Sequence, residues 1–112
     1  MKKKYTHNEA MFIRLLQRPN KYVSISNVRE YTKAHCQSEC FNVNSRANDL
    51  RNLGYDIENK IEKVNGVSHS SYKINVTDQE LKVIRKLYLE NFKIPIYTTV
   101  QNQLKPKQLT FI

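Results

Sequence analysis

Glycine is scarce in this chain of 112 residues, which has only Gly54 and Gly66, and tryptophan is absent. A phosphate-binding loop of a nucleotide-binding fold needs several glycines close together, so such a loop is excluded. Both glycines are instead expected at turns, where positive φ costs them little. Acidic residues are also few, 10 against 19 Lys and Arg, and no pair of carboxylates stands beside a histidine as an acid–base site. We therefore predict that the protein is not an enzyme.

Only two cysteines are present, Cys36 and Cys40, which is too few for a disulfide framework. His35 lies next to them, but a structural zinc ion needs four ligands, and His7 and His69 lie far away in the sequence. We therefore predict no metal and no cofactor. The thiols are expected to be reduced and partly buried near a helix end.

Long apolar runs are missing as well, since none approaches the ~18 residues that cross a bilayer. The basic start is followed by the polar residues 5–9, so the apolar part of a secretion signal is absent and we expect a cytoplasmic location without a membrane partner. The net charge is +9 and the pI about 9.7. This balance favours a polyanionic partner, either nucleic acid or an anionic membrane surface.

The segment 42–54 predicts a short helix. Val43, Ala47, Leu50 and Leu53 form an apolar stripe at helical spacing, and Gly54 follows where a helix often ends in the left-handed conformation. The opposite side of the helix carries amide, hydroxyl, carboxylate and guanidinium groups, which can pair with base edges in a major groove. The residues predicted to contact DNA from this helix are Asn44, Ser45, Arg46, Asn48, Asp49, Arg51 and Asn52.

The role of Arg46 and the role of the whole polar side both remain open. Arg46 lies nearer the apolar stripe, and it either reaches a phosphate or pairs with Asp49 three residues later. An ordinary solvated polar face is the alternative to a DNA-reading face.

A β-hairpin is predicted directly after this helix. Residues 56–64 and 68–76 read as two strands, and Asn65-Gly66 between them is typical of a two-residue hairpin turn. Lys60, Lys63 and His69 lie towards the expected tip, within reach of backbone phosphates or a minor groove.

The segment 44–74 resembles a family of small phage and prophage helix-turn-helix domains. Their pattern S-R-x-x-D-L-R-x-L-G-Y-x-I is matched by SRANDLRNLGYDI, and Tyr72 takes the place of the tyrosine in their closing strand. The resemblance covers about a third of the chain and implies a winged-helix fold, binding to double-stranded DNA, and a phage-encoded or prophage protein in a bacterial host. Ala47 and the long segment Cys36–Cys40 depart from the family pattern.

The other elements complete this fold class, α+β and mainly α. Thr6 with Glu9, and Thr77 with Glu80, form capping boxes that predict helices over 6–17 and 78–92. A short strand at 22–23 is expected to pair with the wing, and Ser24 or Ser26 to begin a helix that runs to Ala34. We thus predict a winged helix-turn-helix domain over 1–93, with an added C-terminal helix, and an extended or flexible tail over 94–112. The apolar face of the helix 78–92 serves either core packing or a homodimer contact.

Both ends of the chain carry candidate contacts. Lys2, Lys3 and Lys4 are predicted to touch DNA, or else form a solvated terminus. The end resembles the Q-L-x-L-F peptide that docks on the bacterial sliding clamp, through Gln108, Leu109, Phe111 and Ile112. The alternatives are a tail folded back on its own domain or exchanged between protomers.

Three functions follow from these patterns. The first is a transcriptional regulator of phage type that reads duplex DNA. The second is a replication or recombination accessory protein that binds DNA and docks on the sliding clamp. The third is a phage inhibitor that acts by protein–protein interaction.

Overall fold

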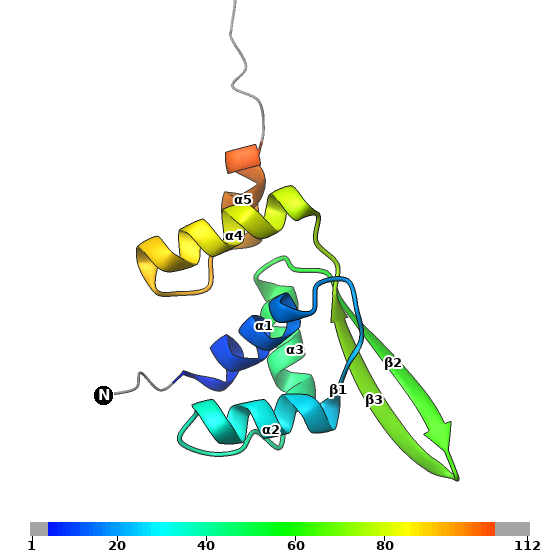
Figure 1. Ribbon diagram of the computed structural model, residues 1–112. Helices are drawn as coiled ribbons and strands as arrows, with labels where there is room; N and C mark the ends of the chain where they lie inside the picture. Colours follow the sequence, from blue (N-terminus) through cyan, green and yellow to red (C-terminus); the bar gives the residue numbers. More distant parts are fainter. Residues whose placement is uncertain (1–4, 105–112) are drawn as a thin grey trace, which may run out of the picture.

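The computed structural model describes residues 5–104 as a small α+β domain, mainly helical, with an antiparallel sheet (Figure 1). Its helices and strands, in chain order, are α1 His7–Gln17, β1 Val23–Ser24, α2 Ile25–His35, α3 Val43–Asn52, β2 Ile57–Val64, β3 Val67–Ile74, α4 Asp78–Asn91 and α5 Tyr97–Leu104. No helix within the described part of the chain has both the length and the apolar character to cross a membrane.

Helix α1 forms the centre of the core. Thr6 and Glu9 cap its start reciprocally, as predicted, and the helix ends before Pro19, whose ring disfavours helical backbone at the preceding residue. Met11, Phe12 and Leu15 are at most 1% exposed and pack with residues of the other helices and of the sheet. Because α1 contacts α2, α3 and β3, it fixes the positions of all three.

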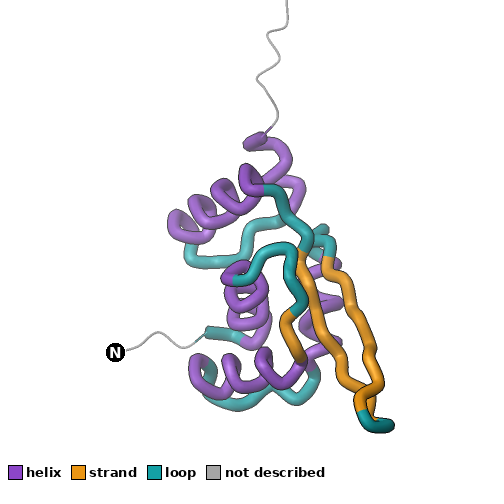
Figure 2. The backbone as a smooth tube through the Cα atoms, turned by 45° about the vertical axis from the view of Figure 1, so that its right-hand side comes forward, coloured by secondary structure: helices purple, strands orange, loops and turns teal. Residues whose placement is uncertain are grey.

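The three strands are ordered β1-β3-β2. The predicted short strand is confirmed one residue later than expected, with Val23 opposite Tyr72. Asn65 and Gly66 have φ of 53° and 79°, as the predicted hairpin turn requires. Only the base of the β2–β3 hairpin is buried, at Ile57, Tyr72 and Ile74, and the remaining length extends beyond the helices (Figure 2).

The link between α2 and α3 brings the two helices together. Ser24 rather than Ser26 caps α2, and Asn42 caps α3 by accepting a hydrogen bond from the backbone N–H of Ser45. Thr32 is buried and accepts a hydrogen bond from the Cys40 N–H at 2.9 Å, which holds the connecting segment against α2. The predicted apolar stripe of α3 is confirmed at Val43, Ala47 and Leu50, all at most 1% exposed.

The C-terminal part differs from its prediction. Helix α4 begins after the predicted Thr77 capping box and ends at Asn91, and the following Phe92 adopts left-handed backbone with φ 54°. The expectation of an extended or flexible segment is wrong for Tyr97–Leu104, which form α5 and pack on α4. The physical reason is that this polar stretch still presents Tyr97, Val100 and Leu104 at helical spacing, and Val100 is fully buried.

Candidate nucleic-acid interface

Helix α3 carries a stripe of amide side chains on the side away from the core. Asn44, Asn48 and Asn52 recur every four residues and are all exposed. Residues at this spacing stack along one side of a helix, so the three amides form a continuous row. This row, which we call the asparagine stripe, is therefore exposed to a partner along the length of α3.

The other predicted residues of α3 are half-buried, and most of them are engaged within the protein. Arg46 pairs with Asp49 at 3.3 Å, which confirms one of its two predicted interpretations. The Nε of Arg46 is buried, and it has no hydrogen-bond partner among the described residues. Ser45 is half-buried beside this pair.

Arg51 links α3 to the hairpin. Its Nε donates to the Ile57 carbonyl at 3.0 Å, and its Nη1 donates to the Asn48 Oδ1 at 2.8 Å. Arg51 was predicted to point outward to DNA. Two of its guanidinium N–H groups instead hold the start of β2 and the side chain of Asn48. A carbonyl oxygen accepts two hydrogen bonds, so Asn48 keeps one lone pair and both amide N–H donors for a partner.

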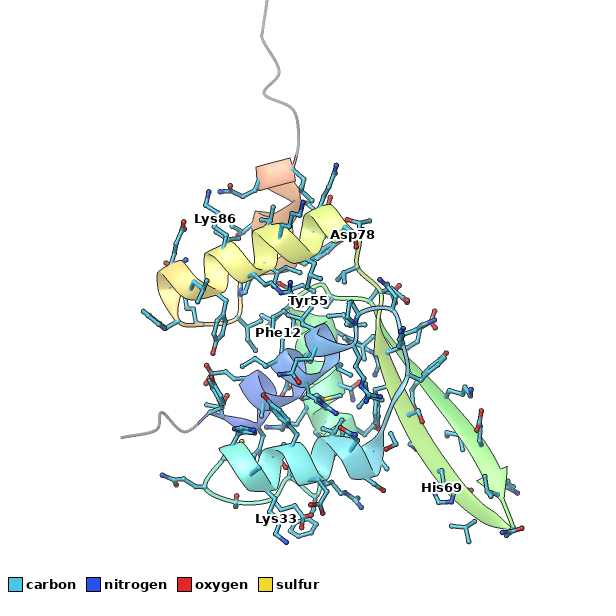
Figure 3. All side chains as sticks on the ribbon, in the orientation of Figure 1. Phe12, Lys33, Tyr55, His69, Asp78 and Lys86 are labelled. Atoms are coloured by element: carbon cyan, nitrogen blue, oxygen red, sulfur yellow. The ribbon has the colours of Figure 1, made fainter. Side chains whose placement is uncertain are left out.

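The predicted hairpin residues lie on two different faces. Residues that pair across strands share a face, and successive residues alternate. Lys60 and Glu62 therefore share a face with His69, the cross-strand partner of Glu62. Figure 3 shows His69 towards the hairpin tip. We call this side of the hairpin the charged face.

Charges on this face neutralise one another. Lys60 pairs with Glu62 at 2.5 Å, and Lys73 pairs with Glu58 at 3.0 Å. Both ammonium groups also lie 4.8 Å from the centre of the Tyr22 ring, an arrangement that attracts a cation to the face of an aromatic ring.

The pKa values reflect this pairing. The hydrogen bond with Glu62 raises the pKa of Lys60, and the hydrogen bond with Lys73, aided by the Tyr22 hydroxyl, lowers the pKa of Glu58. These groups are therefore charged at neutral pH and held by each other.

The opposite side of the hairpin continues from the buried base, and we call it the core-side face. Its members on the two strands are Ile57, Asn59, Ile61, Lys63, Ser68, Ser70, Tyr72 and Ile74. Lys63 is exposed and is the one charged residue among them. Ile61 is 65% exposed beside it. This face carries no carboxylate, so it repels a phosphate backbone less than the charged face does.

Several predicted contacts lie outside the described residues. These are Lys2, Lys3 and Lys4 at the start of the chain, and Gln108, Leu109, Phe111 and Ile112 at its end.

Sequence reasoning missed three residues that shape this region. Tyr22 anchors the charged face, and Lys73 belongs to the same cluster. Arg29 of α2 donates to the Phe41 carbonyl at 3.4 Å, just before α3. Lys73 was predictable as an outward position of an alternating strand, but the Tyr22 contact depends on the pairing of β1 with β3.

The apolar face of α4 is largely used inside the chain. Leu81, Ile84 and Leu87 are at most 8% exposed, whereas Leu89 is 70% exposed and borders an open groove of about 310 Å³ between α1 and α4. A dimer contact through α4 stays a prediction, and it would have to use Leu89 and its surroundings rather than the buried three.

No cluster of three His, Cys, Asp or Glu within 5–104 is arranged to hold a metal ion. Cys36 and Cys40 are both free and buried, and burial raises the pKa of the Cys36 thiol, which lowers its reactivity.

Comparison with known proteins adds no relative: no protein-family model, curated protein or solved structure matches this chain. The function is therefore inferred from the geometry of α3 and the hairpin.

Proposed function

We propose that this protein is a winged-helix DNA-binding protein of phage type that acts as a transcriptional regulator. Helix α3 enters the major groove of duplex DNA, and the β2–β3 hairpin is the wing beside it. The order of α1, β1, α2, α3, β2 and β3 supports this fold assignment. The asparagine stripe is the observation that carries the functional assignment.

Asparagine suits base recognition because its amide offers a donor and an acceptor side by side. Such a group pairs with N6 and N7 of adenine in the major groove. The Arg51 hydrogen bond to the Asn48 Oδ1 restricts the orientation of this amide, and the second lone pair of Oδ1 and both N–H donors stay available to a base. A side chain held in one orientation loses less rotamer freedom on binding than a free one.

The hairpin supplies the electrostatic part of the proposal. Lys63 has no ion-pair partner among the described residues, whereas the carboxylates of Glu62 and Glu58 hold Lys60 and Lys73. We infer that the core-side face of the hairpin lies along the phosphate backbone, with Lys63 as its main charged contact. The net charge of +9 supports association with any duplex and contributes affinity without sequence preference.

Selection of bound sequences from a random duplex library tests the proposal. A regulator enriches one consensus, and a palindromic consensus adds a dimer with two half-sites. Absence of enrichment contradicts a sequence-reading regulator.

Substitution in the stripe identifies the reading residue. Asn48→Ala is expected to weaken binding to the selected site by about 1–3 kcal/mol and to relax the preference at one base pair. The matched control is Asn102→Ala, an exposed asparagine on α5, which should leave both unchanged. Equal affinity of Asn48→Ala and the unmodified protein for the selected site contradicts the assignment of Asn48.

A further inference from the structure

The proposed reading helix and wing meet at a short junction, residues 53–56, between the end of α3 and the start of β2. The relative position of the two elements depends on how firmly this junction is held. One stabilising contact is the hydrogen bond from Arg51 of α3 to the Ile57 carbonyl. The other contacts come from the C-terminal segment 94–104.

Tyr97, the first residue of α5, contacts the junction through its backbone. Its N–H donates to the carbonyl of Leu53 at 2.9 Å. Leu53 is the C-cap of α3, and carbonyls at a helix end lack a partner within their own helix. Tyr97 therefore provides the hydrogen bond that α3 itself does not.

The next two junction residues pack against the same segment. A Cβ atom on Gly54 would lie 2.8 Å from the Cβ of Tyr97, so any larger residue at position 54 would clash with the Tyr97 side chain. The Tyr55 hydroxyl donates to the Pro95 carbonyl at 2.6 Å, and the Tyr55 and Tyr97 rings meet edge to face at 5.4 Å. Figure 3 shows Tyr55 and Phe12 in the layer between α4 and α1.

The side chain of Tyr97 is fixed at its other end. Its hydroxyl donates to the Glu80 carboxylate, and the Gln101 amide donates to the same carboxylate and to the Tyr97 hydroxyl. Glu80 is 6% exposed and belongs to the capping box of α4. Tyr97 thus bridges α4 and the end of α3, and it holds the junction against a rigid support.

We propose that Tyr97 is a positioning residue for DNA recognition: it holds the α3–β2 junction so that the asparagine stripe and the wing meet the same duplex in register. This inference rests on the proposed function. Sequence-specific binding needs both elements in place, whereas nonspecific binding depends on charge and tolerates a change in their angle. Loss of Tyr97 therefore weakens specific binding selectively.

The experiment measures two affinities for each variant, one for the selected duplex and one for a scrambled duplex of the same length. Tyr97→Ala is expected to weaken specific binding about tenfold, or ~1.4 kcal/mol, while binding to the scrambled duplex and its salt slope stay the same. Both variants keep the backbone N–H that donates to Leu53. Tyr97→Phe removes only the hydroxyl, whereas Tyr97→Ala also removes the ring, so the specific affinity of Tyr97→Phe should fall less. Thr98→Ala, an exposed neighbour in α5, is the matched control and should change neither affinity.

A second measurement separates positioning from loss of fold. Amide hydrogen exchange in Tyr97→Ala should accelerate at residues 53–57 and remain slow in the centre of α1. If Tyr97→Ala does not fold, Tyr97→Phe and Tyr55→Phe carry the test. Tyr97→Phe removes the two hydrogen bonds of the Tyr97 hydroxyl, Tyr55→Phe removes the one to the Pro95 carbonyl, and both variants keep the ring.

Two results would overturn the inference. One is an equal loss of specific and nonspecific affinity, and the other is unchanged specific affinity with faster exchange confined to α4 and α5. Failure of the proposed function is distinguishable, because Asn48→Ala then has no effect and no duplex is preferred in any variant.

Discussion

At the scale of single residues, exposure divides the polar side chains of α3 into two groups. Asn44, Asn48 and Asn52 are exposed, while Arg46 and Arg51 are engaged within the protein. Helical periodicity was enough to predict a polar side opposite the apolar stripe, but that prediction also included Ser45, Asp49 and Arg51, which are half-buried. It was not enough to predict the role of Arg51, because a guanidinium on a long flexible stem takes the nearest acceptor, and the Ile57 carbonyl comes close only after β2 is placed.

The two hairpin lysines offer a matched pair for testing which face meets DNA. Lys63→Ala is expected to reduce the salt slope of duplex binding by about 0.9, the value of one phosphate contact. Lys60→Ala should reduce it less, because Lys60 already pairs with Glu62 and lies over the Tyr22 ring. The measurement is affinity for one duplex over a series of salt concentrations. A larger effect from Lys60→Ala would assign the charged face to DNA instead.

At the scale of elements, local rules predicted most of the fold. The two capping boxes located the starts of α1 and α4, and the Asn65-Gly66 turn located the hairpin. Helix α5 was missed because its residues are polar and its stability comes from contacts distant in sequence. Val100 fits the core, and Tyr97 and Gln101 meet Glu80, and none of these contacts is visible in a local pattern.

The two glycines test the contact between α5 and the end of α3. Gly66→Ala, at φ 79° in open space, is expected to cost about 1–2 kcal/mol of unfolding free energy through backbone strain alone. Gly54→Ala, at φ 103°, adds a clash with the Cβ of Tyr97 and should cost about 1–3 kcal/mol more. Urea denaturation of both variants compares these losses. Equal losses of unfolding free energy in the two variants would mean that α5 moves away from position 54 without destabilising the protein.

Glu80 gives the α4–α5 contact a dependence on pH. Burial raises the pKa of this carboxyl, but hydrogen bonds from Tyr97, Thr77 and Gln101 outweigh it and lower the pKa below its usual value of 4.5. A carboxyl with a lowered pKa in the folded state stabilises the fold above 4.5, and this contribution is lost as the pH falls through the lowered value. The stability difference between the unmodified protein and Glu80→Gln should therefore be largest at neutral pH and shrink in acid.

Unfolding free energies at neutral pH and well below pH 4.5 measure this effect. Glu90→Gln, which replaces an exposed carboxylate on the same helix, is the control and should show little difference at either pH. A Glu80→Gln difference that stays constant with pH would contradict a charged Glu80 at the centre of the network.

At the scale of the whole molecule, charge and shape support the same partner. The chain has a net charge of +9, and its hairpin extends beyond the helical body next to α3 (Figure 1). Composition was enough to predict a polyanionic partner. One face of the hairpin neutralises its own charges, and the lysine of the other face has no carboxylate partner within residues 5–104. This division depends on strand register, which sequence alone placed only approximately.

The central claim is that α3 and the hairpin contact one duplex together. Nuclear magnetic resonance titration of the isotope-labelled protein with a selected duplex, at a salt concentration of about 0.15 M, tests it directly. The account predicts that the side-chain amide signals of Asn44, Asn48 and Asn52 shift together with the backbone signals of Ile61 and Lys63. Shifts confined to the groove between α1 and α4, or to the hairpin without the asparagine stripe, would contradict it.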